Sequence, residues 1–215
     1  MDAAQGTSAG TVGFDLDLTL VDSADGIVAT FLATARRLGQ VVDAEDLRAT
    51  IGIPLETACA LHLPEVAEEA VRIYRELYPT TGVAGTRLLP GARAALDAVH
   101  ERGDLVAVVT AKIESAARLL LEHVDLAVDV IAADRYAEGK GLALVELGAW
   151  ALVGDHPGDM IGARTAGVVA VGVTSGSHDA DALRAAGADV VLETLEDFPD
   201  WLEAVSAEGR TPTEP

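Results

Sequence analysis

The chain has 215 residues, 50% of them hydrophobic, and a formal net charge of −20 at pH 7, which disfavours binding to nucleic acids or anionic membranes because both depend on lysine and arginine. Its single cysteine, Cys59, excludes an internal disulfide, and we find neither a signal-peptide pattern nor an apolar run of about 20 residues that would span a bilayer. We therefore expect a globular cytoplasmic protein that has neither nucleic acid nor a membrane as its partner.

The first informative segment is residues 11–21, which follows a small, polar stretch expected to be a flexible leader, residues 1–10. It begins as an apolar strand, but Asp15 and Asp17 interrupt it two positions apart. Carboxylates are disfavoured inside a buried strand, so both are expected at the strand's carboxyl end, on one face if the strand continues through them. Crowded carboxylates repel each other unless a cation or a shared proton holds them. The pattern Asp-x-Asp-x-Thr therefore suggests a magnesium site.

The segment from residue 24 to residue 89 shows helical periodicity. Helices are predicted after Ser23, across residues 44–50, after Pro54 and, over a longer stretch, from Pro64. The first of these helices is expected to bury a stripe made by Ile27, Phe31, Ala35 and Leu38. Because strands resume only later, we predict that residues 24–89 form a helical insertion.

The remainder of the chain alternates apolar strands with helices. Strands are predicted at residues 105–109, 128–132, 151–154, 168–173 and 190–192. Helices are predicted at residues 92–102, 115–123, 142–147, 157–166 and 180–186. This alternation indicates an α/β fold with a doubly wound parallel sheet covered on both faces. We predict that the sheet domain comprises residues 11–23 and 90–205, and that residues 206–215 form a flexible tail.

Several polar residues follow the predicted strands, at the edge where ligands bind in open α/β sheets. Thr110 and Asp155 each end a strand, and Asp159 lies in the first turn of the next helix. Each has an ordinary alternative: Thr110 as a strand-end residue, Asp159 as a complement to the helix dipole, and Lys140 as a solvated loop lysine. The chain has only two lysines, Lys112 and Lys140, and both fall near these positions.

Four segments together resemble the haloacid dehalogenase superfamily, and most of all its subgroup that includes phosphoglycolate phosphatase. The similar segments, in chain order, are Asp15-Leu16-Asp17-Leu18-Thr19, Val108-Val109-Thr110-Ala111-Lys112, Glu138-Gly139-Lys140-Gly141 and Gly154-Asp155-His156-Pro157-Gly158-Asp159. The resemblance implies a Rossmann-like core, and it implies that the helical insertion is a cap that closes over the active site.

The resemblance also implies roles for the acidic residues. Asp15 would be the nucleophile that forms an aspartyl-phosphate, and Asp17 the general acid and base. Mg²⁺ would be bound by the Asp15 carboxylate, the Asp17 carbonyl oxygen and Asp155, with Asp159 bound directly or through water. The presence of Asp17 favours a phosphohydrolase, because dehalogenases of this superfamily lack the second acid and need no magnesium.

The groups expected to hold the substrate phosphate are Lys140, the Thr110 hydroxyl and backbone N–H groups that include that of Ala111. Two departures from the family pattern bear on this site. Leu18 replaces the glycine commonly found there, and Gly141 replaces the proline that usually follows the lysine of the third motif. The second departure lies directly beside Lys140.

The predicted cap narrows the substrate by what it lacks. No lysine lies between Ser23 and Pro90, which disfavours the Schiff-base chemistry of phosphonate-cleaving relatives, and Leu55 stands where sugar-phosphate mutases carry an arginine. We therefore predict hydrolysis of a small phosphorylated metabolite such as 2-phosphoglycolate, with Arg48 as a candidate for its carboxylate. The alternatives are a pyrophosphatase or nucleotide phosphatase on the same site, and a phosphate-binding module without catalysis.

Overall fold

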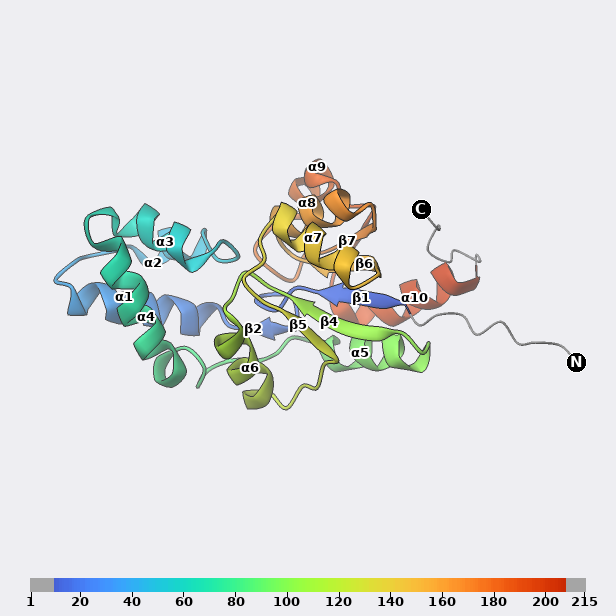
Figure 1. Ribbon diagram of the computed structural model, residues 1–215, viewed down its shortest axis with the longest axis horizontal. Coiled ribbons are helices and arrows are strands. Elements are labelled where there is room, and N and C mark those ends of the chain that lie inside the picture. The colour runs from blue at the N-terminus through green and yellow to red at the C-terminus, as the bar shows by residue number, and fades with distance from the viewer. Residues whose placement is uncertain (1–9, 208–215) are drawn as a thin grey trace, which may run out of the picture.

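The computed structural model describes residues 10–207 and contains a six-stranded parallel sheet in the order β5-β4-β1-β6-β7-β8 (Figure 1). Of the predicted flexible leader and tail, all but Gly10, Ser206 and Ala207 lie outside the described residues. The strands are β1 (Thr11–Phe14), β4 (Leu105–Val109), β5 (Val130–Ala132), β6 (Ala149–Gly154), β7 (Val169–Val173) and β8 (Val190–Leu192). Every pairing in this sheet is parallel, which confirms the predicted α/β fold.

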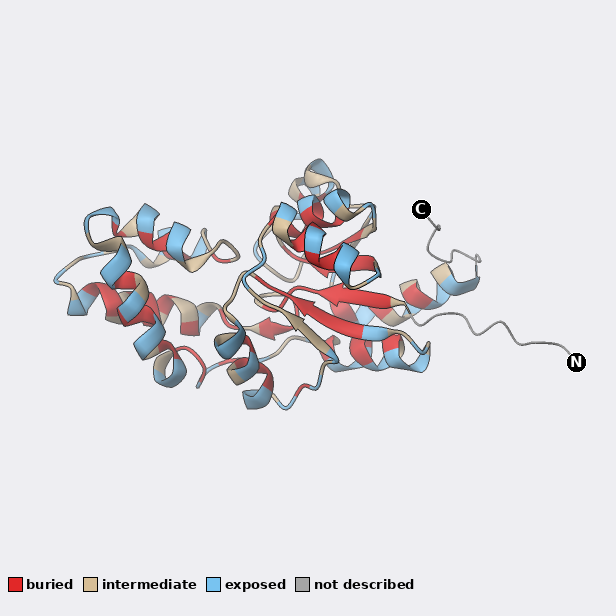
Figure 2. Ribbon diagram, in the orientation of Figure 1, coloured by how far each residue is buried: buried red, intermediate tan, exposed pale blue. Residues whose placement is uncertain are grey.

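Helices cover both faces of the sheet (Figure 1). One face carries α7 (Glu138–Glu146), α8 (Pro157–Ala166) and α9 (Ala180–Ala186), and the other carries α5 (Ala92–Glu101), α6 (Glu114–His123) and α10 (Phe198–Ala207). The central strand β1 is buried throughout, and the ring of Phe14 lies 5.3 Å from that of Phe198. Figure 2 shows the buried residues concentrated in the central strands. Because both faces are covered, these strands are apolar along nearly their whole length, with Thr11 of β1 as a buried polar exception.

The second part of the fold is a group of helices that we call the helical block, residues 24–81. It consists of α1 (Ala24–Arg37), α2 (Ala44–Arg48), α3 (Leu55–His62), a short 3₁₀ helix (Pro64–Val66) and α4 (Ala67–Thr81). The carboxyl ends of β1 and β4 face this block (Figure 1). The chain enters the block after β2 (Val21–Asp22) and leaves it before β3 (Arg87–Leu88), and these two short strands pair antiparallel. Within residues 10–207, no helix is long and apolar enough to cross a bilayer.

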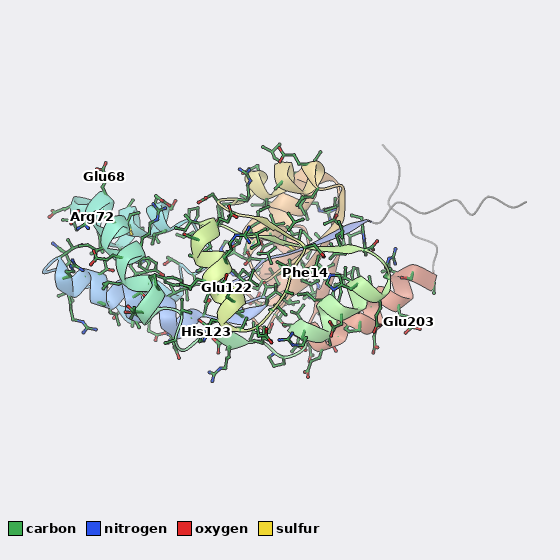
Figure 3. The ribbon with its side chains drawn as sticks, turned by 60° about the horizontal axis from the view of Figure 1, so that its bottom comes forward. Phe14, Glu68, Arg72, Glu122, His123 and Glu203 are labelled. Carbon is green, nitrogen blue, oxygen red and sulfur yellow. The ribbon has the colours of Figure 1, made fainter. Side chains whose placement is uncertain are left out.

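The amphipathic pattern of the helices matches where their side chains lie (Figure 3). Phe14 lies among the interior side chains, whereas Glu68 and Arg72 lie on the outer side of α4 and Glu203 lies on the outer side of α10. Burial of one apolar face, rather than helix propensity alone, stabilises helices of this length.

The predicted first strand is wrong beyond Phe14, where β1 ends. The carbonyl oxygen of Leu16 accepts hydrogen bonds from the backbone N–H groups of Leu20 and Val21, and Leu18 has a left-handed φ of 60°. This turn separates β1 from β2. Asp15 and Asp17 therefore lie on a loop, and their side chains do not share one strand face.

Two helices of the sheet domain also differ from the prediction. Helix α7 begins at Glu138 rather than at residue 142, which puts Lys140 on a helix and not in a loop. Gly141 allows this, because a Cβ there would lie 2.5 Å from Cβ of Thr165 on α8, so the two helices pack closer than side chains permit. Helix α10 was not predicted, and it is held by the packing of Phe198 and Leu202 on the core.

Candidate active site

The loop after β1 presents two carboxylates in different directions. The backbone N–H of Asp15 donates to the carbonyl oxygen of Val153 at 2.8 Å, so the start of this loop is still anchored to β6. The Asp15 side chain is buried and contacts Lys140, whereas the Asp17 side chain contacts Lys112 and Ser23. The two acids thus begin two separate clusters of charge.

The first cluster contains three buried carboxylates, those of Asp15, Asp155 and Asp159, with one oxygen of each lying within 4.8 Å of the others. Lys140 is 2% exposed, and its Nζ donates to Oδ1 of Asp15 at 2.6 Å and to Oδ1 of Asp159 at 2.5 Å. A solvated loop lysine is therefore the wrong description of Lys140. Its ammonium group offsets part of the negative charge that the three acids would otherwise concentrate.

Each of the other two acids is held by its own set of donors. Asp155 accepts from the Thr19 hydroxyl at 3.0 Å and from the Ser177 N–H and hydroxyl at 2.9 Å each. Asp159 accepts from the N–H of His156 at 3.0 Å in the capping box that begins α8. Asp159 thus does complement the start of a helix, and it belongs to the acidic cluster as well.

Two glycines leave the space that these carboxylates occupy. A Cβ on Gly154 would lie 2.2 Å from Oδ2 of Asp159, and a Cβ on Gly176 would lie 2.2 Å from Oδ2 of Asp155. Any side chain at either position would force a carboxylate out of place. Oxygen ligands clustered in this way are what Mg²⁺ prefers, so the residues present fit a divalent cation, with the Asp17 side chain outside the cluster.

Burial governs the protonation of this cluster. It raises the pKa of Asp15 to about 7, against the opposing charge of Lys140 and reinforced by that of Asp159. Burial also raises the pKa of Asp155, and the charge of Asp15 raises it further. The pKa of Asp159 is likewise raised by burial. Burial alone would lower the pKa of Lys140, but the charges of Asp15 and Asp159 outweigh it and raise the pKa. A bound cation would favour the ionised acids.

The second cluster surrounds Asp17. Nζ of Lys112 lies 2.8 Å from one carboxylate oxygen of Asp17 and 3.1 Å from the other, and the Ser23 hydroxyl donates at 2.5 Å. Ser23 precedes α1 but makes no side-chain cap for it, because its hydroxyl is turned to Asp17. The same Nζ lies 4.7 Å from the ring centroid of Tyr78 on α4. Asp17 and Lys112 therefore link the sheet domain to the helical block.

Lys112 is the functional candidate to which sequence reasoning assigned no role. The sequence did contain a signal for it, since Lys112 and Lys140 are the only lysines and both lie in segments that resemble the family motifs. Sequence spacing does not show which acid each lysine meets, because the partners are 95 and 125 positions away in the chain. The structure pairs Lys112 with Asp17 and Lys140 with Asp15.

The phosphate-binding candidates lie beside both acids. Thr110 is buried at the end of β4, and its hydroxyl accepts from the N–H of Lys112 at 3.2 Å, which shapes the loop that follows. A cavity of about 420 Å³ between the sheet domain and the helical block is lined by Asp15, Asp17, Thr110 and Ala111. Lys140, Asp155 and Asp159 do not line this cavity, but each lies close to Asp15, which does. Asp15 thus connects the acidic cluster to the space where a substrate would bind.

Comparisons with known proteins agree with this arrangement. The sequence profile of the family described as haloacid dehalogenase-like hydrolase matches residues 12–140, and a related profile matches residues 125–198. The chain is 37% identical to the probable phosphatase IndB of Dickeya dadantii, over 85% of this chain and 88% of that protein. It is 35% identical to the tyrosine-protein kinase PtkA of Mycobacterium tuberculosis, over 88% of this chain and 64% of that protein.

Two further similarities cover nearly the whole fold. The chain is 33% identical to the phosphoglycolate phosphatase of Rhodospirillum rubrum, over 88% of this chain and 89% of that protein. A crystal structure of a predicted phosphatase from Clostridium acetobutylicum superposes with a TM-score of 0.81 at 26% identity, covering 92% of this chain and 100% of that one. The sheet, its helices and the helical block are therefore shared with solved structures of this kind.

Proposed function

Because this chain belongs to the haloacid dehalogenase-like hydrolase family and is a phosphoric monoester hydrolase, we propose that it hydrolyses a small organic phosphate monoester in a Mg²⁺-dependent reaction through an aspartyl-phosphate on Asp15. One observation carries this proposal. Asp15 is the residue that both belongs to the buried cluster of three acids and lines the cavity. A nucleophile in this reaction must meet the metal and the substrate at once.

Asp15 is proposed to attack phosphorus with the carboxylate oxygen that Lys140 does not hold. Lys140 contacts Oδ1, which leaves Oδ2 to form the new P–O bond as the bond to the leaving alkoxide breaks. Water then attacks the aspartyl-phosphate, releases phosphate and restores the carboxylate. Bound Mg²⁺, held by the Asp15 and Asp155 carboxylates, the Asp17 carbonyl oxygen and, directly or through water, Asp159, would neutralise charge on the phosphoryl oxygens.

Asp17 is proposed to protonate the leaving alkoxide and then to take a proton from the attacking water. Its place two residues after the nucleophile, on a loop turned by Leu16 and Leu18, puts it in the same cavity. Lys112 and Ser23 hold the Asp17 carboxylate in a defined orientation. Thr110 and the N–H of Ala111, which line the same cavity, are proposed to hold phosphoryl oxygens.

The sequence resemblance and a relative named phosphoglycolate phosphatase support 2-phosphoglycolate as the reference substrate. A pyrophosphatase or a nucleotide phosphatase would use the same reacting groups and differ in the group that the cavity holds. We further propose that the enzyme works in the cytoplasm on a soluble phosphorylated metabolite.

The experiment is phosphate release from a panel of phosphorylated metabolites, with and without Mg²⁺, by the parent protein and by Asp15→Asn. We expect release that requires Mg²⁺ and is lost in the variant. Asp181→Asn is the matched control, because that carboxylate is 98% exposed on α9. Phosphate release by Asp15→Asn at the parent rate would refute the nucleophile. If the parent protein releases phosphate from no metabolite on the panel, the phosphate-binding module would be favoured instead.

A further inference from the structure

We propose that the organic part of the substrate is an uncharged, apolar group larger than a two-carbon acid, aliphatic or aromatic, bound in the cavity between the helical block and the carboxyl edge of the sheet. This inference rests on the proposed phosphohydrolase function. It narrows that function from small phosphate monoesters in general to those that carry an apolar or aromatic leaving group, and it therefore replaces 2-phosphoglycolate, whose organic part is a carboxylate, as the expected substrate.

The walls of the cavity are the first observation. Apart from the reacting groups, most of the residues that line it are aliphatic or aromatic, and they come from both domains. Ile53 and Leu55 belong to the helical block, and Leu119 belongs to α6 of the sheet domain. Pockets lined in this way bind ligands chiefly by removing apolar surface from water.

A run of three aromatic rings forms part of the same wall. The ring of Tyr74 lies 4.9 Å from that of Phe31 and 5.5 Å, stacked, from that of Tyr78, and all three residues line the cavity. Aromatic faces and edges pack favourably on a further ring through offset or edge-to-face contacts. The wall is therefore suited to a ring-bearing ligand.

The charges around the cavity argue against a substrate carboxylate. Among the described residues that line it, the cations are Lys112 and Arg75. Lys112 is held by both oxygens of Asp17, and Arg75 is paired with Glu56 at 2.5 Å. A substrate carboxylate would have to compete with a protein carboxylate for either cation. Leaving Asp17 unpaired would be unfavourable because its side chain is largely buried, whereas the Arg75–Glu56 pair is exposed and therefore weaker.

The arginine that the sequence suggested for a carboxylate is placed elsewhere. Arg48 is paired with Asp25 at the surface and does not line the cavity. The cavity volume of about 420 Å³ also exceeds what a two-carbon acid fills, since pockets of this size enclose much larger ligands. A glycolate group would leave most of the apolar wall in contact with water.

The test compares three substrates with Mg²⁺ present: ethyl phosphate, 2-phenylethyl phosphate and 2-phosphoglycolate. The first two release primary alcohols of similar acidity, so a difference between them reports the binding of the ring rather than leaving-group chemistry. We expect kcat/KM for 2-phenylethyl phosphate to exceed that for ethyl phosphate by about tenfold or more, because the ring is buried. Equal values, or a preference for 2-phosphoglycolate, would overturn the inference.

A pair of variants on one helix locates the effect. Leu55 lines the cavity at the start of α3, whereas Leu61 on the same helix is 61% exposed and does not line it. Leu55→Arg is expected to lower kcat/KM for 2-phenylethyl phosphate by about tenfold and to raise that for 2-phosphoglycolate, because it adds a cation to an apolar wall. Leu61→Arg should change neither value. If both variants behave alike, the ring does not bind against Leu55.

A failure of the proposed function gives a different result from a failure of this inference. Absence of phosphate release from all three compounds would refute the proposed hydrolysis of small organic phosphate monoesters. In that case the binding of two phosphonates to the Mg²⁺-loaded protein, measured by calorimetry, still decides the inference. Tighter binding of 2-phenylethylphosphonate than of phosphonoacetate supports an apolar site, and equal or weaker binding overturns it.

Discussion

Lys112 holds both carboxylate oxygens of Asp17, at 2.8 and 3.1 Å, while its ammonium group lies against the ring of Tyr78 on α4. One side chain of the sheet domain thus contacts the proposed general acid and the helical block together. Burial disfavours the charge of Lys112 and lowers its pKa, but the charge of Asp17 more than offsets this and raises it. The ammonium group therefore stays charged across the physiological pH range.

The first prediction concerns this contact. Lys112→Met should reduce kcat by about tenfold or more, because Asp17 loses the cation that orients it and general acid–base catalysis depends on that orientation. Steady-state kinetics with Mg²⁺ saturating measure the change. Lys112→Arg is the control, because it keeps the charge and should retain more activity than the methionine variant. An unchanged kcat in Lys112→Met would show that Ser23 suffices to position Asp17.

The second prediction concerns the metal. Mg²⁺ should raise the melting temperature of the parent protein, since a ligand that binds only the folded state stabilises it by mass action. Asp155→Asn should weaken that response, because Asp155 belongs to the cluster of three acids. Thermal unfolding at increasing Mg²⁺ concentration measures both. Asp181→Asn, on the exposed surface of α9, should respond like the parent. An equal response in Asp155→Asn would remove Asp155 from the metal site.

The third prediction concerns pH in the absence of metal. The pKa of Asp15 is about 7 in the folded protein and about 3.8 for the ordinary carboxyl group. The folded state then binds the proton more tightly than the unfolded state, so this group makes stability fall as the pH rises between these two values. Asp15→Asn removes the effect. In EDTA, its melting temperature should exceed that of the parent near pH 7.

The control for the third prediction is the low-pH limit. Near about pH 4 the buried Asp15 is protonated in the folded parent, so the two proteins should melt at similar temperatures. The difference between them should therefore grow as the pH rises. A difference that stays constant over this range would mean that Asp15 does not titrate there.

The fourth prediction concerns the space around Asp159. Gly154→Ala places a Cβ 2.2 Å from Oδ2 of Asp159, and overpacking of this kind should lower the free energy of unfolding by about 1–3 kcal/mol. It should also weaken the Mg²⁺ response, because Asp159 must move. Gly85→Ala is the control, since a Cβ there meets nothing within 4 Å. Denaturant unfolding measures both variants. Equal stability of the two variants would mean that the Asp159 side chain can move aside without lowering the free energy of unfolding.

Local patterns in the sequence were sufficient to predict many of the strands and helices of the sheet domain. Strands Leu105–Val109 and Val190–Leu192 and helices Pro157–Ala166 and Ala180–Ala186 lie where periodicity and capping residues predicted them. Proline at the start of α8 and glycine directly after α9 mark those helices because they act within a turn of their own position. The order of the four motif-like segments was sufficient to predict the family, and it singled out Asp15, Asp155 and Asp159, which the structure brings together in one cluster.

Other features depend on contacts between distant segments. Helix α7 was predicted to begin four residues too late because Gly139 and Gly141 are poor helix formers by themselves. In the fold, the close packing of Gly141 on α8 outweighs that preference. Helix α10 carries Pro199 and was not predicted. It is stabilised by the packing of its apolar face on Phe14 and the rest of the core, which the local sequence does not reveal.

The sequence by itself therefore determined the α/β class and most of the strands and helices of the sheet domain, and it singled out the acids that the structure gathers in one cluster, since these follow from patterns that act over a few neighbouring residues. Only the tertiary structure decided that Lys140 lies between Asp15 and Asp159, that Lys112 holds Asp17, and that apolar side chains line the cavity. Each of these depends on the packing of segments tens of residues apart. Charge pairing and burial at such separations are set by the packed fold and not by local spacing.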